Sequence, residues 1–204
     1  EISCSLVGSE MCIRDRIEYI IDQVKKTVKK YDETDPIRLA DAMKIIVSYK
    51  PMGTDEGCIK GFFVIAKRIK HITINSDLPE ELQKVILAHE IGHAVLHKED
   101  AQVAAFHELM LFDGVDHKEY EANIFASELL LSNEDVMDAI NEDQFFFDAA
   151  RQLCVPPEML DFKFRIMKKQ GFKVESPIIA NGDFLKHAER MSACLLYTSD
   201  AADD

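Results

Sequence analysis

The stretch His89-Glu90-Ile91-Gly92-His93 decides how the rest of this 204-residue chain is interpreted. It reads H-E-x-x-H, and apolar residues recur around it every three to four positions, which is typical of an amphipathic helix. Residues four apart in a helix lie one above the other, so His89 and His93 can share one metal ion. Neutral imidazole is a good zinc ligand, and Glu90 suits a general base acting on water. The stretch therefore predicts two metal ligands and a catalytic glutamate on one helix.

Small residues within the predicted helix indicate that a second backbone lies against it. Ala88, Gly92 and Ala94 would let another element approach near the histidines. A glycine inside a helix costs about 1 kcal/mol relative to alanine, so Gly92 requires a packing reason. We expect the helix to start at Asp77, with the acidic stretch 79–81 in its first turn.

Two histidines do not complete a metal site, and three candidates compete for the third position. His97 continues the histidine stripe but lies two helical turns from His89, too far for both rings to meet one ion easily. A carboxylate from a second helix, expected at 118–131, is geometrically easier. Glu121 borders the apolar face of that helix and is the predicted third ligand, with Glu119 as the alternative. Three protein ligands would leave one position for water, as in open, catalytic zinc sites.

The remaining patterns predict an α+β fold, with a small, mainly antiparallel sheet packed on a mostly helical domain and H-E-x-x-H on the central helix. A further helix at 101–112 is ambiguous. Two helices around Val155-Pro156 would form a helical C-terminal subregion at 142–170. The expected elements are helices at 17–31, 35–43, 77–97, 118–131, 133–140, 144–154 and 157–169, and strands at 44–49, 58–66 and 69–75.

Both ends of the chain resemble translations of sequencing-library adapters. Residues 1–16 contain Leu-Val-Gly-Ser-Glu-Met-Cys-Ile-Arg-Asp, and residues 194–204 read Cys-Leu-Leu-Tyr-Thr-Ser-Asp-Ala-Ala-Asp-Asp. We expect these ends to be artefacts, to be left out of fold reasoning as a fusion scar would be. Residues 17–173 then form one domain, and 174–193 a weakly patterned tail.

Composition narrows the classes of function. The chain has 37 acidic against 24 basic residues and a formal net charge of −13, which disfavours direct binding to nucleic acid. No apolar run is long enough to span a membrane. Outside the two ends only Cys58 and Cys154 remain, and they have neither the spacing of a cysteine zinc site nor that of a disulfide framework. This usage fits a reducing cytoplasm. The oligomeric state cannot be deduced from these patterns.

Two motifs in this order carry a resemblance. H-E-I-G-H at 89–93 is followed, after a variable loop, by E-x-E-A-N-x-F-A-x-x-L-L-L at 119–131. Together they resemble the ImmA/IrrE family of zincin-like metallo-endopeptidases from bacteria, phages and mobile elements, over roughly residues 17–170. The resemblance implies a cytoplasmic peptidase with Zn²⁺ on His89, His93 and Glu121. It also implies a protein substrate, namely a helix-turn-helix repressor.

The resemblance further implies that Glu90 takes a proton from water and later gives it to the leaving amine. The residue that stabilises the oxyanion stays open among Tyr120, His107 and His71. Two other interpretations also stay open. The chain could be a non-catalytic, zinc-containing module that binds a repressor or a toxin. Alternatively, it could be a structural helical domain in which H-E-x-x-H is accidental.

Overall fold

The computed structural model describes residues 5–55, 57–98, 115–140 and 145–185, with side chains described from Arg16 onward except at 115 and 116. His107, the ambiguous 101–112 stretch and the end at 194–204 lie outside the described residues. The elements, in chain order, are α1 (Ser5–Tyr31), α2 (Pro36–Ala42), β1 (Ile45–Lys50), β2 (Gly61–Ala66), β3 (Ile69–Asn75), α3 (Glu80–Leu96), α4 (Val115–Leu130), α5 (Asn133–Ala139), α6 (Phe146–Gln152) and α7 (Pro157–Lys169).

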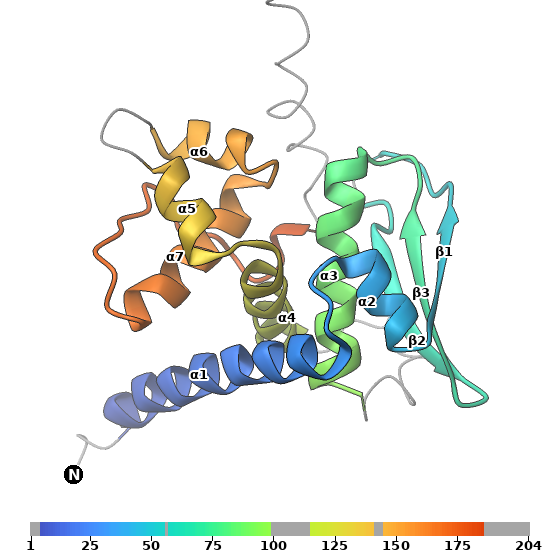
Figure 1. Cartoon of the computed structure of the whole chain (residues 1–204), viewed down its shortest axis with the longest axis horizontal. Helices are drawn as coiled ribbons and strands as arrows, with labels where there is room; N and C mark the ends of the chain where they lie inside the picture. The colour runs from blue at the N-terminus through green and yellow to red at the C-terminus, as the bar shows by residue number, and fades with distance from the viewer. Residues whose placement is uncertain (1–4, 56, 99–114, 141–144, 186–204) are drawn as a thin grey trace, which may run out of the picture.

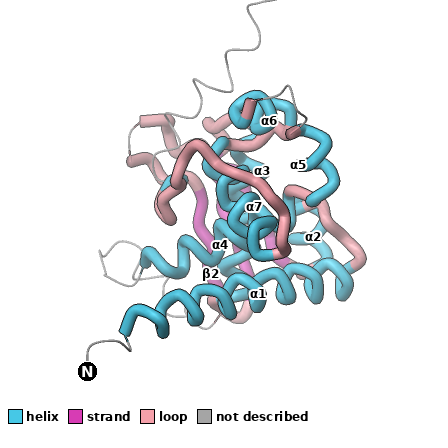
Figure 2. The backbone as a smooth tube through the Cα atoms, turned by 90° about the vertical axis from the view of Figure 1, so that its left-hand side faces the viewer, coloured by secondary structure: helices cyan, strands magenta, loops and turns pink. Residues whose placement is uncertain are grey.

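Helix α3, which carries H-E-x-x-H, lies at the centre of the molecule. Figure 1 shows the sheet against one side of α3 and α4 against the other, with α5, α6 and α7 beyond α4. Helix α1 runs along one side of this assembly, and in the second view the strands lie behind the helices (Figure 2). The expected α+β class and the central position of the motif helix are therefore confirmed. None of the helices in the described part of the chain is both long and apolar enough to cross a membrane.

The three-stranded sheet is mixed, with the order β1-β3-β2. Strands β2 and β3 are antiparallel, as expected, and are joined by Lys67 and Arg68, which both have positive φ values of 51° and 68°. Such a two-residue turn matches the twist of the strands that it connects. Strand β1 is instead parallel to β3, with Ile45 opposite Lys70. The hairpin folds β3 back between β2 and β1, and this placement could not be deduced from the alternation of apolar residues.

Local signals set the ends of two helices in different ways. Asp35 caps α2, because its Oδ1 accepts from the backbone N–H of Ile37 and Arg38, both at 3.1 Å. The expected start of α3 at Asp77 is wrong: α3 begins at Glu80, after Pro79. The carboxylate of Asp77 accepts instead from the backbone N–H of Gly53 at 2.7 Å, so it holds the preceding loop rather than the helix.

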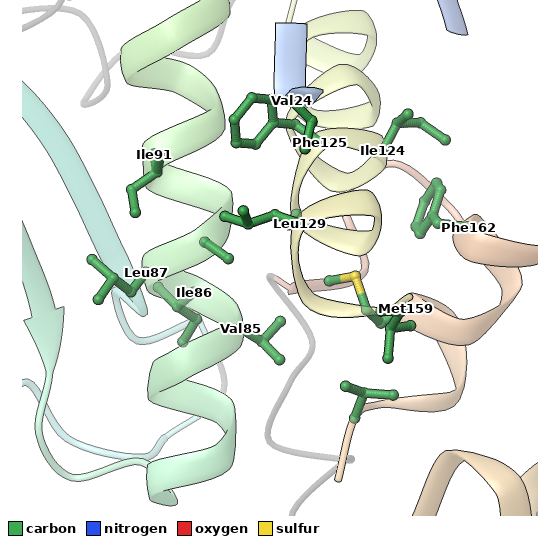
Figure 3. Close-up of a cluster of buried hydrophobic side chains, with 14 of the residues drawn as sticks. Val24, Val85, Ile86, Leu87, Ile91, Ile124, Phe125, Leu129, Met159 and Phe162 are labelled. Atoms are coloured by element: carbon green, nitrogen blue, oxygen red, sulfur yellow. The ribbon is translucent and has the colours of Figure 1, made fainter. Parts of the chain in front are cut away.

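The packing of α3 on α4 explains the glycine in the motif. A Cβ atom on Gly92 would lie 3.2 Å from the Cα and O atoms of Ala122 and from the Cβ atom of Phe125. Figure 3 shows Ile91 beside the sheet and Phe125 and Leu129 between the two helices. The small residue thus lets the α4 backbone come close to the histidines, as the sequence predicted.

The segment after α7 packs on the helices rather than leaving them. Val174, Ala180, Phe184 and Leu185 are all buried. The buried carboxylate of Asp161 accepts from the backbone N–H of Ala180 at 3.0 Å, which fastens the segment to α7. The sequence of this region carries little periodicity, and its contribution to the core could not be predicted from pattern.

Candidate metal centre

Three side chains from α3 and α4 converge on one point. His89 and His93 lie one turn apart on α3, and their Nε2 atoms are 3.0 Å apart. The carboxylate of Glu119, near the start of α4, lies 3.2 Å from the Nε2 of His89 and 3.4 Å from that of His93. These three residues form a group whose ligand atoms could hold one metal ion.

The spacing of these atoms fits a small tetrahedral cation. Zinc binds imidazole nitrogen and carboxylate oxygen at about 2.0–2.2 Å, which puts neighbouring ligand atoms about 3.3 Å apart. The observed separations of 3.0 to 3.4 Å match that value. The side chains of His93 and Glu119 are 18% and 23% exposed, so the group is open to solvent on one side. Three ligands and an open side are the arrangement of a catalytic zinc site.

Glu121, the predicted third ligand, lies outside this group, and Glu119, the alternative, lies within it. Two residues along a helix correspond to a turn of about 200°, so Glu119 and Glu121 cannot both face the same point. The Oε2 of Glu121 lies 2.9 Å from the Nε2 of His97. Its two oxygens also accept from Arg16, at 2.6 and 2.7 Å.

Asn123 fixes the ring of His89. The amide Nδ2 of Asn123 donates to the carbonyl of Gly182 at 2.6 Å, so its Oδ1 faces the other way. That oxygen lies 2.8 Å from the Nδ1 of His89, which must therefore carry the proton and donate it. In the neutral ring the lone pair is then on Nε2, where it is available to a metal ion, whereas the protonated ring donates from Nε2 to Glu119. Such outer contacts set the tautomer and orientation of metal-binding histidines.

His97 occupies the equivalent position behind His93. Its Nδ1 lies 3.1 Å from the Nδ1 of His93, on the ring edge remote from Glu119. His97 is therefore not in the group around the two Nε2 atoms. It is the C-cap residue of α3, and its side chain turns back towards α4.

Glu90 lies beside the group but is not a member of it. It follows His89 on α3 and is 7% exposed. Its charge is near enough to contribute to the pKa of His89. A carboxylate in this place can accept a proton from a water held at the open side of the group.

Burial and the shared carboxylate control the ionisation of the group. Burial opposes the charged form of Glu119, but hydrogen bonds from His89 and His93 outweigh it and hold the pKa of Glu119 well below its usual range. Burial also lowers the pKa of both imidazoles. The pKa of His89 is nevertheless raised overall by Glu119, Glu90 and Asn123, whereas neighbouring histidines help to lower that of His93. The group therefore presents an ionised carboxylate to a cation.

The residues that orient the ligands, Asn123 and Gly182, were not predicted from the sequence. Asn123 follows Glu119 by four positions, so helical spacing alone could have placed it on the same face. Gly182 had no signal, because its carbonyl comes from an irregular segment. Of the oxyanion candidates, the ring of Tyr120 packs edge-on against Phe162, 5.5 Å between centroids, and His71 is half-buried on β3.

Known proteins are similar to this chain over most of its length. A model of the peptidase M78 family, described as the IrrE N-terminal-like domain, matches residues 40–165. The "Uncharacterized immunity region protein 2" of Bacillus phage phi105 is 36% identical over 155 residues, which cover 75% of this chain and 95% of the relative. The "Metallopeptidase ImmA" of Bacillus subtilis strain 168 is 26% identical over 144 residues, covering 69% of this chain and 81% of the relative.

Proposed function

From the premise that the chain belongs to the ImmA/IrrE family of metallopeptidases, we propose that it is a zinc-dependent endopeptidase whose substrate is a helix-turn-helix repressor. One observation carries the zinc assignment. Two imidazole nitrogens and a carboxylate lie 3.0 to 3.4 Å apart on an open side of the molecule. His89, His93 and Glu119 would hold the ion, in place of the set with Glu121.

When bound, zinc would polarise the substrate carbonyl and make a neighbouring water more acidic. Glu90 would take the proton from this water on its carboxylate and deliver it to the amine that leaves. Glu119 would supply the negative charge of the ligand set. Asn123 would keep the Nε2 of His89 unprotonated and directed at the ion.

The choice of substrate rests on relatives. In the family that the motifs resemble, characterised members inactivate a helix-turn-helix repressor by proteolysis. One relative of this chain is named an immunity region protein of a phage and another a metallopeptidase. A repressor acts where DNA is, so we place the reaction in the cytoplasm.

The test uses the purified chain and any helix-turn-helix repressor that is encoded beside its gene. We expect about one zinc per chain, cleavage of the repressor, loss of cleavage with a chelator and recovery when zinc is returned. Glu90→Gln should bind zinc as the unaltered chain does and leave the repressor intact. Zinc binding without cleavage by the unaltered chain would favour the non-catalytic repressor- or toxin-binding module. The absence of zinc would favour the accidental motif.

A further inference from the structure

A chain of contacts leads from Glu121 through His97 to His93, on the side of His93 remote from Glu119. The Nε2 of His97 lies 2.9 Å from the Oε2 of Glu121, and its Nδ1 lies 3.1 Å from the Nδ1 of His93. His97 is 8% exposed, and the side chain of Glu121 is 13% exposed. Both ring nitrogens of His97 therefore have a protein partner and little access to water.

The chemistry of these contacts allows one arrangement of protons when His97 is neutral. A carboxylate only accepts, so the Nε2 of His97 must carry a proton and donate it to Glu121. The Nδ1 of His97 is then a lone pair, which must accept from an N–H on the Nδ1 of His93. Neutral His93 then has its lone pair on Nε2, the atom that would bind a metal ion held together with Glu119. The opposite arrangement would place a lone pair of His97 against the carboxylate.

From these contacts we infer that His97 and Glu121 are positioning residues, which fix the tautomer and the ring orientation of His93 for metal binding. The inference rests on the proposed zinc site. The contact of His97 with His93 resembles that of Asn123 with His89, but the two orienting residues come from different elements. Asn123 lies on α4 and is oriented by the segment after α7, whereas His97 ends α3 and is oriented by α4. Each imidazole is thus held from behind by its own partner.

Arg16 also binds Glu121, but the role assigned to His97 does not require it. The side chain of Arg16 is 48% exposed, and an exposed ion pair contributes little. Arg16 is also the last residue of the stretch that resembles a translated adapter. Glu121 can accept from His97 whatever residue stands at position 16. We therefore expect Arg16→Met to change zinc affinity less than about twofold.

The experiment measures zinc affinity by competition with a chromophoric chelator, together with the visible absorption of the cobalt-loaded protein. His97→Leu keeps bulk but removes both ring nitrogens, and should weaken zinc binding about 10- to 100-fold. It should also alter the cobalt spectrum, because His93 is free to turn. His97→Asn retains an acceptor, its Oδ1, where Nδ1 stood, and should bind zinc within about threefold of the unaltered chain. His117→Leu, an exposed histidine on α4, is the matched control and should match the unaltered chain.

Glu121→Leu gives a second, independent variant should His97→Leu fail to fold, which thermal unfolding of the metal-free protein would reveal. It should weaken zinc binding about tenfold. Zinc affinity within threefold of the unaltered chain in the folded Leu variants would overturn the inference. So would equal weakening by His97→Asn and His97→Leu. A chain that binds no zinc even when unaltered would instead overturn the proposed function, so the two failures are distinguishable.

Discussion

At the scale of single residues, two glutamates on α4 have opposite surroundings although they are only two positions apart. Glu119 faces the paired Nε2 atoms of His89 and His93, and its low pKa reflects their hydrogen bonds. Glu121 faces His97 and Arg16, and burial is again outweighed by these partners, so its pKa is also lowered. Both carboxylates are ionised at neutral pH, but only Glu119 is directed at the candidate ion.

This difference predicts different outcomes for two matched variants. Glu119→Gln removes the charge from the ligand set, and an amide oxygen is a poor ligand for zinc. We expect zinc affinity to fall by more than about 100-fold. This loss is larger than the one expected when a residue that only orients a ligand is replaced. Glu121→Gln still offers an oxygen to His97 and should retain one zinc per chain. Metal analysis after dialysis against a weak chelator would check both variants. If Glu121→Gln lost its zinc and Glu119→Gln kept it, Glu121 would be the third ligand, as expected from the sequence.

The histidine pair was predictable because four-residue spacing on one helix is local geometry. The choice between Glu119 and Glu121 was not, because it depends on the rotation of α4 about its axis. That rotation is set by the contact of Ala122 with Gly92 and by packing on α7, neither of which is written in the sequence of α4 alone. Ala122 was expected to face the core and does so, but Glu119 approaches the histidines from the other flank of that face.

At the scale of elements, the close approach of α3 and α4 determines whether the ligands meet. Gly92→Ala should help an isolated helix by about 1 kcal/mol. In this protein the new methyl group would lie 3.2 Å from two backbone atoms of Ala122, which cannot move aside as a flexible side chain could. We expect the free energy of unfolding to fall by about 1–3 kcal/mol.

The same substitution should also weaken zinc binding, because separating the helices moves Glu119 away from the histidines. Denaturant unfolding of the metal-free chain and zinc competition would measure the two effects. Ala94→Gly on the same helix is the control. It lowers helix propensity without adding bulk, and it should leave zinc affinity within about twofold because it removes no ligand and no contact that orients a ligand. A Gly92→Ala chain as stable as the unaltered one would contradict this account of the helix contact.

A buried ion pair joins α4 to α7 and gives the stability a dependence on pH. The Nζ of Lys163 donates to the Oε2 of Glu128 at 2.6 Å, and Lys163 is 1% exposed. Burial lowers the pKa of Lys163 below its ordinary 10.5, and Glu128 only partly opposes this. At pH values between the pKa of Lys163 in the folded chain and its ordinary pKa, this amine is protonated in the unfolded chain but not in the folded one. The free energy of unfolding therefore rises with pH in that window.

We therefore expect this contribution to the free energy of unfolding to increase as pH rises towards 10.5 and to be smallest at pH values below the folded pKa. The double variant Lys163→Met with Glu128→Gln lacks the titrating amine and should not show the rise. At neutral pH the double variant should be about as stable as the unaltered chain or more so, whereas Lys163→Met alone should cost about 3–5 kcal/mol. Urea unfolding across the pH range would check both, and parallel pH profiles for the unaltered chain and the double variant would contradict the assignment.

At the scale of the whole molecule, the site depends on parts of the chain far from the motif. The family model covers residues 40–165. The Gly182 carbonyl that orients Asn123 lies beyond that range, and so do the buried residues from Val174 to Leu185. The two helices that carry the ligands and most of the strands were predictable, because their periodicity is local. The parallel pairing of β1 and the return of the last segment were not, because both depend on contacts between distant residues.

The attachment of that last segment to α7 yields a prediction that joins stability to the site. The buried Asp161 accepts from the backbone N–H of Ala180 and from Arg165, which in turn donates to the Ala180 carbonyl. Asp161→Ala would leave the buried N–H of Ala180 without its acceptor and would remove the ion pair with the part-exposed Arg165, at a cost of about 1–3 kcal/mol in the free energy of unfolding. Asp148→Ala removes a similar aspartate–arginine pair whose aspartate is 44% exposed, and should cost about 1 kcal/mol or less.

Zinc affinity gives the second readout of this pair of variants. If the segment supports Asn123 through Gly182, loosening it in Asp161→Ala should also weaken zinc binding, by up to the roughly 10-fold expected for a lost outer contact. Asp148→Ala should bind zinc as the unaltered chain does. A destabilised Asp161→Ala chain with unchanged zinc affinity would mean that α4 alone holds Asn123 in place. Loss of both properties would show that the irregular segment after α7 is part of the structure that holds His89 in the orientation a metal ion requires.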